Sequence, residues 1–192
     1  MKILVVGSFR YETYAKAFYE AFRRMGHTVR SLDTEQFELK EDNPLSLAAG
    51  KVKRHWLISP AIGAASRALK REVSQFRPDL VFLYHCYFLH PSAVKEISCL
   101  TTVFSCENDD PFEKRSDKPN ASYYIKAARH CRLNYVFRHK NVEDFARIGV
   151  DNAKVLLPYY LETRNYPLAC GKDIPLAFAG HWEDDGRDRM IV

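Results

Sequence analysis

The sequence predicts an α/β fold, a Rossmann-like doubly wound parallel sheet, and three observations lead to this prediction. Apolar runs of strand length recur along the 192 residues, amphipathic helical patterns lie between them, and Gly or Pro stands where elements end. Strands that alternate with helices form parallel sheets covered by helices. At 46% hydrophobic and 28% charged residues, the chain can bury such a core and differs from a disordered protein.

The first β-α-β unit is predicted within residues 3–33. Residues 3–6 are a continuous apolar run that ends in Gly7, as expected for a strand buried on both faces. An amphipathic helix follows, and Gly26 stands at its carboxyl end, where a positive φ is favoured. Residues 28–32 predict the second strand.

The middle of the chain continues this alternation. The polar stretch 34–44 predicts a connection, and two helices are expected after it. The second helix has an apolar stripe that ends before Pro78, formed by Ile62, Ala65, Leu69, Val73 and Phe76. Residues 79–84 and 101–105 predict the third and fourth strands, with a helix capped near Ser92 between them and a long loop from Cys106 to Pro119.

The last part of the chain predicts the end of one domain and the start of another. Residues 122–131 and 142–148 predict helices, and 133–137 and 153–157 predict strands. Residues 174–179 then read as a further buried strand, and 187–192 as the opening of a helix that stops. We therefore expect a Rossmann-like domain at 1–160, a linker at 161–172 and the start of a truncated second domain at 173–192.

Composition narrows the class of protein. The net charge of +5 comes without a run of like charges, so no nucleic-acid partner is expected. The five cysteines are odd in number and lack zinc-site spacing, which predicts reduced thiols, with Cys99 and Cys106 as small buried residues. No signal sequence or transmembrane segment is predicted, and the expected location is cytoplasmic.

Candidate catalytic residues follow the predicted strands, because ligands of open α/β sheets bind at the carboxyl ends of the strands. The adjacent carboxylates Asp109 and Asp110 could accept a proton from a hydroxyl, or their Asp-Asp-Pro sequence could simply form a turn. His85 could be a general base, because its ordinary pKa of about 6.5 suits proton transfer, or an ordinary strand-end histidine. No metal site is predicted, since no third ligand has suitable spacing to the carboxylates.

Candidate binding residues lie in the same loops. Gly7 could supply a tight turn or let a ligand approach the backbone, but its loop lacks the glycine patterns of dinucleotide and phosphate sites. The other substrate-binding candidates are Ser8, Arg10, Glu107, Asn108, Arg138 and His139. In the predicted second domain, Gly180, His181 and Arg187 stand where a helix N-terminus would meet a diphosphate.

Several short pieces appear in an order that resembles the CgeB-like glycosyltransferases, a family of the GT-B type. They are residues 1–7, the unit 14–33 with Met25-Gly26-His27, Pro78-Asp79-Leu80-Val81-Phe82, Asp109-Asp110-Pro111, 141–149, Leu156-Leu157-Pro158 and 173–180. The resemblance implies transfer of a sugar from a nucleotide-sugar donor to an acceptor hydroxyl, without an obligatory metal or other cofactor, between two Rossmann-like halves.

Under this resemblance, residues 1–160 are the acceptor-side domain and 173–192 begin the donor-binding domain. The chain alone is then expected to be inactive, with an acceptor of unknown identity. The alternative is a non-catalytic Rossmann-like module that binds a ligand or partner. A nicotinamide oxidoreductase is disfavoured by the missing glycine fingerprint, and an unpaired edge after Gly180 could allow a homodimer.

Overall fold

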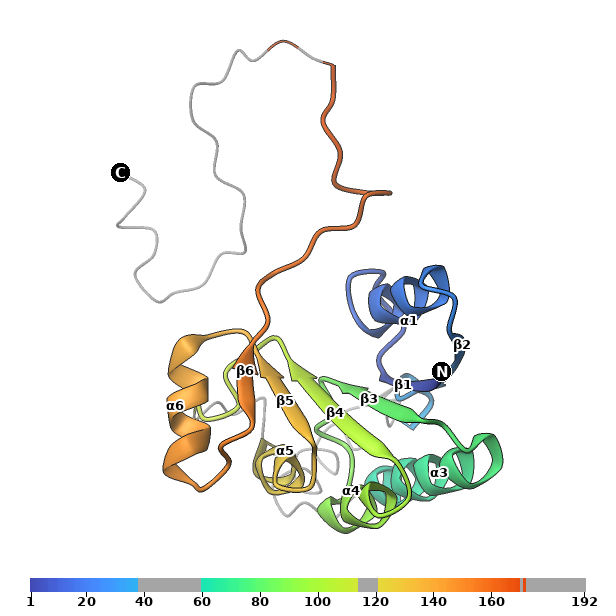
Figure 1. Cartoon of the computed structure of the whole chain (residues 1–192), viewed down its shortest axis with the longest axis vertical. Helices are drawn as coiled ribbons and strands as arrows, with labels where there is room; N and C mark the ends of the chain where they lie inside the picture. Colours follow the sequence, from blue (N-terminus) through green and yellow to red (C-terminus); the bar gives the residue numbers. More distant parts are fainter. Residues whose placement is uncertain (38–59, 114–120, 170, 172–192) are drawn as a thin grey trace, which may run out of the picture. The chain divides into compact units, whose positions relative to one another are not determined.

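Six strands form one all-parallel sheet in the order β2-β1-β3-β4-β5-β6 (Figure 1). The computed structural model describes residues 1–37, 60–113, 121–169 and 171. Within them the strands are β1 (Lys2–Gly7), β2 (Thr28–Asp33), β3 (Leu80–Tyr84), β4 (Thr102–Glu107), β5 (Leu133–Val136) and β6 (Ala153–Val155). The predicted Rossmann-like α/β architecture is therefore confirmed.

The order of strands reverses direction at β1. β2 lies on one side of β1, whereas β3 to β6 follow one another on the other side. In doubly wound sheets the loops diverge at such a switch point and leave a crevice at the carboxyl ends of the two strands concerned. The loops that follow β1 and β3 are therefore the first place to look for a site.

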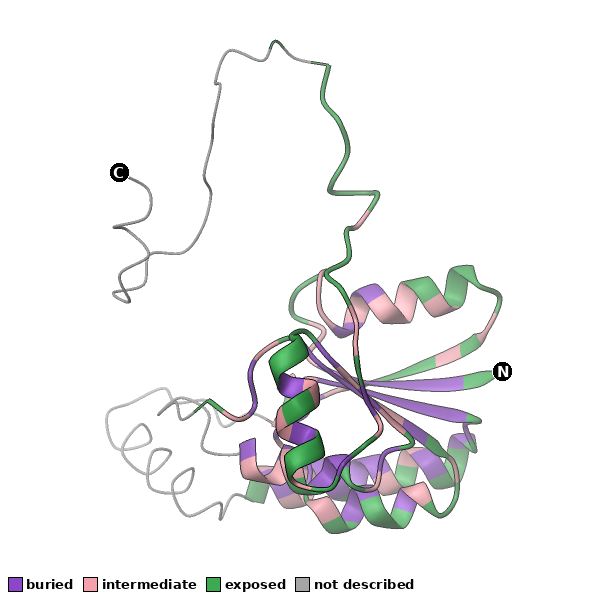
Figure 2. Cartoon of the chain, turned by 60° about the vertical axis from the view of Figure 1, so that its left-hand side comes forward, coloured by how far each residue is buried: buried purple, intermediate pink, exposed green. Residues whose placement is uncertain are grey.

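Helices cover the two faces of the sheet unequally (Figures 1 and 2). One face carries α1 (Ala15–Arg24), and the other carries α3 (Pro60–Phe76), α4 (Pro91–Ser98), α5 (Ala121–Ala128) and α6 (His139–Arg147). A short 3-10 helix, η1 (Glu35–Phe37), follows β2. The face with four helices contains most of the core.

The predicted stripe of α3 is confirmed, since all five of its apolar residues are buried. All of the stripe except Ile62 packs in one cluster with Leu4 and Val81 of the sheet and with Val94 and Ile97 of α4. Burying one such side chain contributes about 1.5–3 kcal/mol. The stripe is therefore sufficient to hold this long helix on the sheet.

The α1 face has an aromatic core. Phe18 and Phe22 lie 4.7 and 5.6 Å from Phe82, measured between ring centroids. Farther along the same face Phe104 and Tyr135 are only half-buried. Gly26 follows the end of α1 with φ of +83°, which confirms its predicted place at the carboxyl end of the helix.

The ends of three elements differ from the sequence predictions. β4 continues to Glu107, two residues beyond the predicted end, because its last two residues are buried and pair with β5. α6 begins at His139 rather than at residue 142, after Arg138 in an extended conformation. α4 is capped by His90, two residues before Ser92, near which the cap was predicted; the His90 ring accepts a hydrogen bond from the Ser92 N–H at 3.2 Å.

Four cysteines belong to the described residues and all are free thiols. Cys86, Cys106 and Cys131 are buried, whereas Cys99 is exposed. The prediction that Cys99 is buried is wrong because this residue caps the carboxyl end of α4 at the surface. Cys170 lies outside the described residues.

Met1–Leu161 form one compact unit and Glu162–Val192 form another. The first of the two helices expected after residue 44, the strand at 174–179 and the helix opening at 187–192 all lie outside the described residues. The division into 1–160, 161–172 and 173–192 therefore stays a prediction. No helix in the described part of the chain is long and apolar enough to cross a membrane.

Candidate functional site

A pocket of about 270 Å³ lies at the carboxyl ends of the strands, beside the switch point between β1 and β3. Its walls come from the loop after β1, from the ends of β3 and β4, and from the segments after β5 and β6. The lining residues are Thr13, Tyr14, Tyr84, Cys106, Glu107, Asn108, Phe137, Leu156, Leu157, Pro158 and Tyr159. All of them belong to the compact unit Met1–Leu161.

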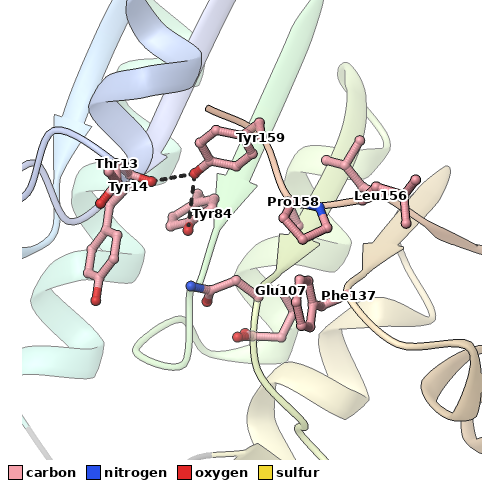
Figure 3. A pocket seen from close by; sticks show the side chains of 11 residues that line it. Thr13, Tyr14, Tyr84, Glu107, Phe137, Leu156, Pro158 and Tyr159 are labelled. Carbon is pink, nitrogen blue, oxygen red and sulfur yellow. Dashed lines mark hydrogen bonds between the residues drawn. The ribbon is translucent and has the colours of Figure 1, made fainter. Parts of the chain in front are cut away.

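Tyr159 closes one side of the pocket (Figure 3). Its hydroxyl donates a hydrogen bond to the Thr13 carbonyl and lies 3.5 Å from the Tyr84 hydroxyl. Its ring packs edge-on against Phe18 of α1, with 5.1 Å between ring centroids. These contacts hold the segment after β6 across the ends of β1 and β3.

The register of β3 and β4 brings His85 next to Glu107. Tyr84 pairs with Cys106, so the residues that follow them are neighbours. His85 Nδ1 lies 2.6 Å from Glu107 Oε1, with the His85 side chain 33% exposed and the Glu107 side chain fully buried. A carboxylate bound to Nδ1 orients the ring and favours the tautomer in which Nε2 accepts a proton.

The backbone of His85 is in the left-handed region, with φ of +51°. This conformation costs a non-glycine residue about 1–2 kcal/mol. It is held by a hydrogen bond from the His85 N–H to the Cys106 carbonyl at 2.9 Å and by an edge-on contact with the Tyr87 ring at 4.7 Å. The fold therefore stabilises an unfavourable backbone conformation at the histidine beside Glu107.

The two oxygens of Glu107 differ in their surroundings. Oε1 faces His85 and also accepts a hydrogen bond from the Asp109 N–H at 3.1 Å. Oε2 is buried and has no hydrogen-bond partner in the described structure. Leaving a buried acceptor unpaired costs about 1–3 kcal/mol. Such an atom, on a residue that lines the pocket, points to a donor supplied by water or a ligand.

The Tyr87 hydroxyl is also buried without a hydrogen bond. Burial first, then the charge of Glu107 and a side-chain interaction with the same carboxylate, raise the pKa of this phenol. The hydroxyl therefore stays protonated near neutral pH, and a small movement of the ring would let it donate to Glu107.

The thiol in the pocket wall is not a nucleophile. Burial, followed by the charge of Glu107, raises the pKa of Cys106 to about 12. A thiol with this pKa is neutral at physiological pH, and the thiolate is the reactive form. Burial likewise raises the pKa of Tyr84, so its hydroxyl remains protonated.

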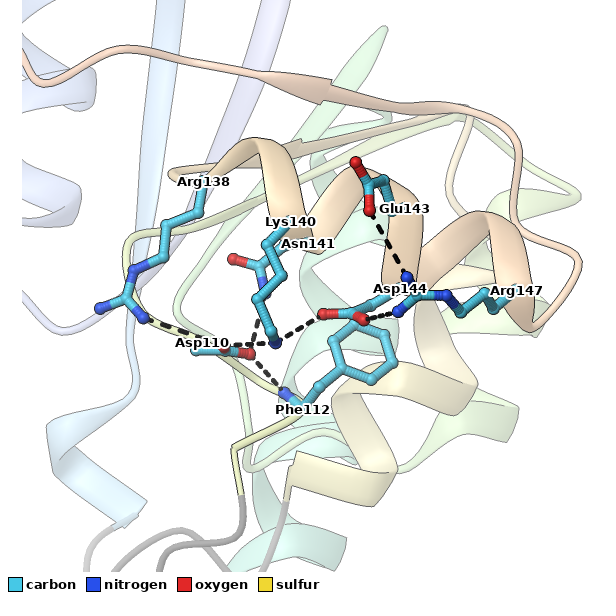
Figure 4. A network of polar contacts seen from close by, with 8 residues as sticks. All are labelled: Asp110, Phe112, Arg138, Lys140, Asn141, Glu143, Asp144 and Arg147. Carbon is cyan, nitrogen blue, oxygen red and sulfur yellow. Dashed lines mark hydrogen bonds and ion pairs between the residues drawn. The ribbon is translucent and has the colours of Figure 1, made fainter.

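Asp110 lies in a different setting, at the start of α6 (Figure 4). Its Oδ1 accepts hydrogen bonds from the Phe112 N–H at 2.9 Å and from Asn141 Nδ2 at 2.8 Å. Its Oδ2 accepts from Lys140 Nζ at 3.0 Å and lies 3.8 Å from Arg138 Nη1. This carboxylate fastens the turn after β4 to α6.

The pKa of Asp110 agrees with a structural role. Burial alone would raise it, but hydrogen bonds from Lys140, from the Phe112 N–H and from Asn141 outweigh burial and hold the pKa below its ordinary value. A carboxylate that stays ionised with both oxygens occupied is a poor proton acceptor. Asp109 is half-buried, and its part as a base stays a prediction.

The candidates in the loop after β1 do not line the pocket. A Cβ atom on Gly7 would lie 2.6 Å from the Tyr84 carbonyl oxygen and 2.9 Å from the Ala15 Cβ. The close approach at Gly7 is therefore between β1, β3 and α1. Ser8 donates its hydroxyl proton to the Glu35 carboxylate, and Arg10 is exposed and lies over the Tyr11 ring at 5.4 Å.

The other binding candidates divide into three groups. Asn108 is exposed and lines the pocket together with Glu107. Arg138 and His139 are exposed at the start of α6 and are not among the lining residues. Gly180, His181 and Arg187, with the homodimer edge expected after Gly180, lie outside the described residues. Within the described ranges, no group of three or more His, Cys, Asp or Glu side chains could hold a metal ion.

The sequence patterns did not indicate the aromatic wall or the His85–Glu107 pair. Tyr14 and Tyr84 match the apolar patterns of a helix and a strand, which hides their place in a pocket. The pair could have been found, because His85 and Glu107 each stand at the end of one of two consecutive strands, and consecutive parallel strands are often neighbours.

No protein-family model matches the chain, and none of the curated proteins matches it.

Proposed function

We propose that the described sheet is the acceptor-side domain of a two-domain glycosyltransferase of the GT-B type. The observation that carries this proposal is the 2.6 Å contact between His85 Nδ1 and Glu107 Oε1, in which Glu107 lines a pocket at the carboxyl ends of the strands while His85 is not among the lining residues. A histidine oriented by a buried carboxylate is a suitable general base near neutral pH. The resemblance to the CgeB-like glycosyltransferases supports the same class of reaction.

In the proposed reaction His85 accepts the proton of the acceptor hydroxyl at Nε2. The acceptor oxygen forms a bond to the anomeric carbon while the bond from that carbon to the phosphate oxygen breaks. The nucleoside diphosphate leaves with the electrons of that bond. Glu107 stabilises the imidazolium, so it is a positioning residue, whereas His85 is the catalytic residue.

The charges of the lining residues favour the sugar acceptor, rather than the nucleotide donor, as the ligand of this pocket. None of the described lining residues is Lys or Arg, the side chains that bind phosphates most often. A nucleotide diphosphate therefore has no cationic partner here. We assign donor binding mainly to a second domain, in agreement with the sequence-based hypothesis for Gly180, His181 and Arg187.

A non-catalytic binding module is the second candidate, and one observation favours it. Every lining residue of the pocket belongs to the compact unit Met1–Leu161, so a ligand could bind there without a second domain. The two candidates differ in whether bound ligand undergoes sugar transfer.

Release of nucleoside diphosphate from a panel of nucleotide sugars tests the proposal. The assay uses the natural protein, including any sequence that follows Val192, with and without candidate acceptors. We expect His85→Asn to lower kcat by about 10²- to 10⁴-fold. Asn is suitable here because it tolerates the left-handed backbone of His85.

His130→Asn is the matched control, because His130 follows α5 and does not line the pocket. It should leave kcat unchanged, and kcat is compared per folded protein, because His85→Asn also removes a partner from the buried Glu107 carboxylate. If His85→Asn keeps wild-type kcat, His85 is not the base. If ligands bind but no nucleotide sugar is consumed, the binding module is the better assignment.

A further inference from the structure

The walls of the pocket favour a flat apolar ligand. The rings of Tyr14, Tyr84, Phe137 and Tyr159 line it, and Leu156 and Pro158 add aliphatic surface (Figure 3). Aromatic side chains pack well against flat rings and against ring faces that present C–H groups. With a volume of about 270 Å³, the pocket is smaller than most drug-binding sites and suits a single ring.

Glu107 adds a requirement for a hydrogen-bond donor. The residue is only 1% exposed, it lines the pocket, and its Oε2 has no hydrogen-bond partner in the described structure. A ligand hydroxyl that donates to Oε2 would remove the cost of the unpaired acceptor. A purely apolar ring of the same size would leave that cost in place.

The charges around the pocket disfavour anions. The pocket wall includes the Glu107 carboxylate, and its partner His85 carries a charge only if it is protonated. With no Lys or Arg among the described lining residues, a phosphate or carboxylate on the ligand would lose its hydration without gaining a cationic partner.

We propose that the pocket binds an uncharged ring with one apolar face and at least two hydroxyl groups, one of which donates to Glu107 Oε2. This proposal rests on the proposed function in taking the second hydroxyl, near His85, as the one that accepts the sugar. The shared chemistry fits two sources of ligand, a sugar ring and a dihydroxylated aromatic ring.

Binding to the 192-residue chain, followed in amide NMR spectra at Glu107, Asn108 and Tyr159, separates these sources. One arm uses methyl glucoside and the other uses catechol. Each arm includes the fully O-methylated form of the ring, which lacks the donor, and a phosphorylated form, which adds an anion. We expect the hydroxylated ring of at least one arm to bind about ten-fold more tightly than both of its derivatives.

Substitutions in the pocket wall test whether the ring binds in this pocket. Tyr159→Ala removes an exposed ring from the wall and should weaken binding about ten-fold, whereas the matched control Tyr160→Ala, next in the chain and outside the pocket, should not. Glu107→Gln should reduce the preference for the hydroxylated ring over its O-methylated form. If Glu107→Gln does not fold, Tyr159→Ala and Phe137→Ala carry the test, since both side chains are more than a third exposed.

Each result has one meaning. The proposal is overturned if neither hydroxylated ring binds, if an O-methylated or phosphorylated form binds equally well, or if Tyr159→Ala binds like the wild type. Tight binding with these preferences but no transfer from nucleotide sugars would support the ligand class and contradict the proposed function. Sugar transfer to an acceptor that does not bind in this pocket would support the proposed function and contradict the ligand class.

Discussion

Glu107 and Asp110 are two buried carboxylates three residues apart, yet their surroundings are opposite. Asp110 is 3% exposed, and both of its oxygens accept hydrogen bonds from α6 or from its own turn. Glu107 is 1% exposed, and one of its oxygens has no partner in the described structure. Asp110 therefore stabilises a turn, while Glu107 is available to a neighbouring histidine and to a ligand.

This difference shows that the position of a carboxylate at the end of a strand is not enough to assign it a catalytic or binding role. Glu107 is the last residue of β4 and the Asp-Asp-Pro turn follows it, so both lie at the edge of the sheet where ligands bind. What separates them is how completely the surrounding donors satisfy each oxygen. A carboxylate whose oxygens are all bonded to the protein stabilises the fold, whereas a carboxylate that contacts a histidine can orient that ring.

The largest effect that would test this comparison is on sugar transfer. We expect Glu107→Gln to lower kcat about 100-fold, because an amide orients the ring less well and does not stabilise the imidazolium. It should also change the pH profile of kcat, which a purely structural role would not do. Asp110→Asn should lower kcat by no more than the loss of folded protein explains.

The measurement is nucleoside diphosphate release across a range of pH, with folded protein quantified by circular dichroism. Equal losses of kcat in the two variants would contradict the separation of roles. A large loss of kcat in Asp110→Asn alone would indicate that the general base lies in the Asp-Asp-Pro turn and is not His85.

Much of the fold could be predicted because each strand and helix carries its own periodic signal. The continuous apolar runs of β1 and β3 and the stripe of α3 reflect burial, which sequence patterns report directly. The boundaries of β4 and α6 could not be predicted, because Glu107 and Asn141 are polar residues buried by tertiary contacts. A pattern of apolar residues ends where such residues begin.

The site was predicted less well than the fold. Position at strand ends drew attention to His85 and Glu107, but their pairing depends on register, and the register of Tyr84 with Cys106 is a tertiary property. Tyr159 reaches Thr13 from a part of the sequence 146 residues away. No local pattern carries such a contact, so the pocket could be found only in the folded chain.

A smaller effect is expected on stability, and it should appear at Asp110. Asp110→Ala removes acceptors from the Phe112 N–H and from the buried Asn141 side chain, which we expect to lower the free energy of unfolding by about 2–3 kcal/mol. The bond to Lys140 adds little, because that lysine is 60% exposed. Glu107→Gln should change the free energy of unfolding by less than about 1 kcal/mol, since one of its oxygens has no bond to lose.

Urea denaturation at several pH values measures both variants. Although burial opposes it, hydrogen bonding keeps the pKa of Asp110 below the ordinary 3.8, so its stabilising effect is present above that value and is lost as pH falls through the folded-state pKa. The difference between wild type and Asp110→Ala should therefore shrink below about pH 4. A difference that stays constant down to pH 2 would mean that the ionised carboxylate is not its source.

The smallest expected effect is at Tyr87, and it decides whether Glu107 Oε2 is available to a ligand. Because the Tyr87 hydroxyl has no hydrogen bond, Tyr87→Phe should change the free energy of unfolding by less than about 0.5 kcal/mol. Tyr124→Phe is the matched control, since it loses a buried 3.2 Å contact with Ser105 and should cost about 1 kcal/mol. If Tyr87→Phe costs about 1.5–3 kcal/mol in urea denaturation, its hydroxyl donates to a charged acceptor. Glu107 would then be satisfied within the protein, like Asp110, and the contrast between the two carboxylates would disappear.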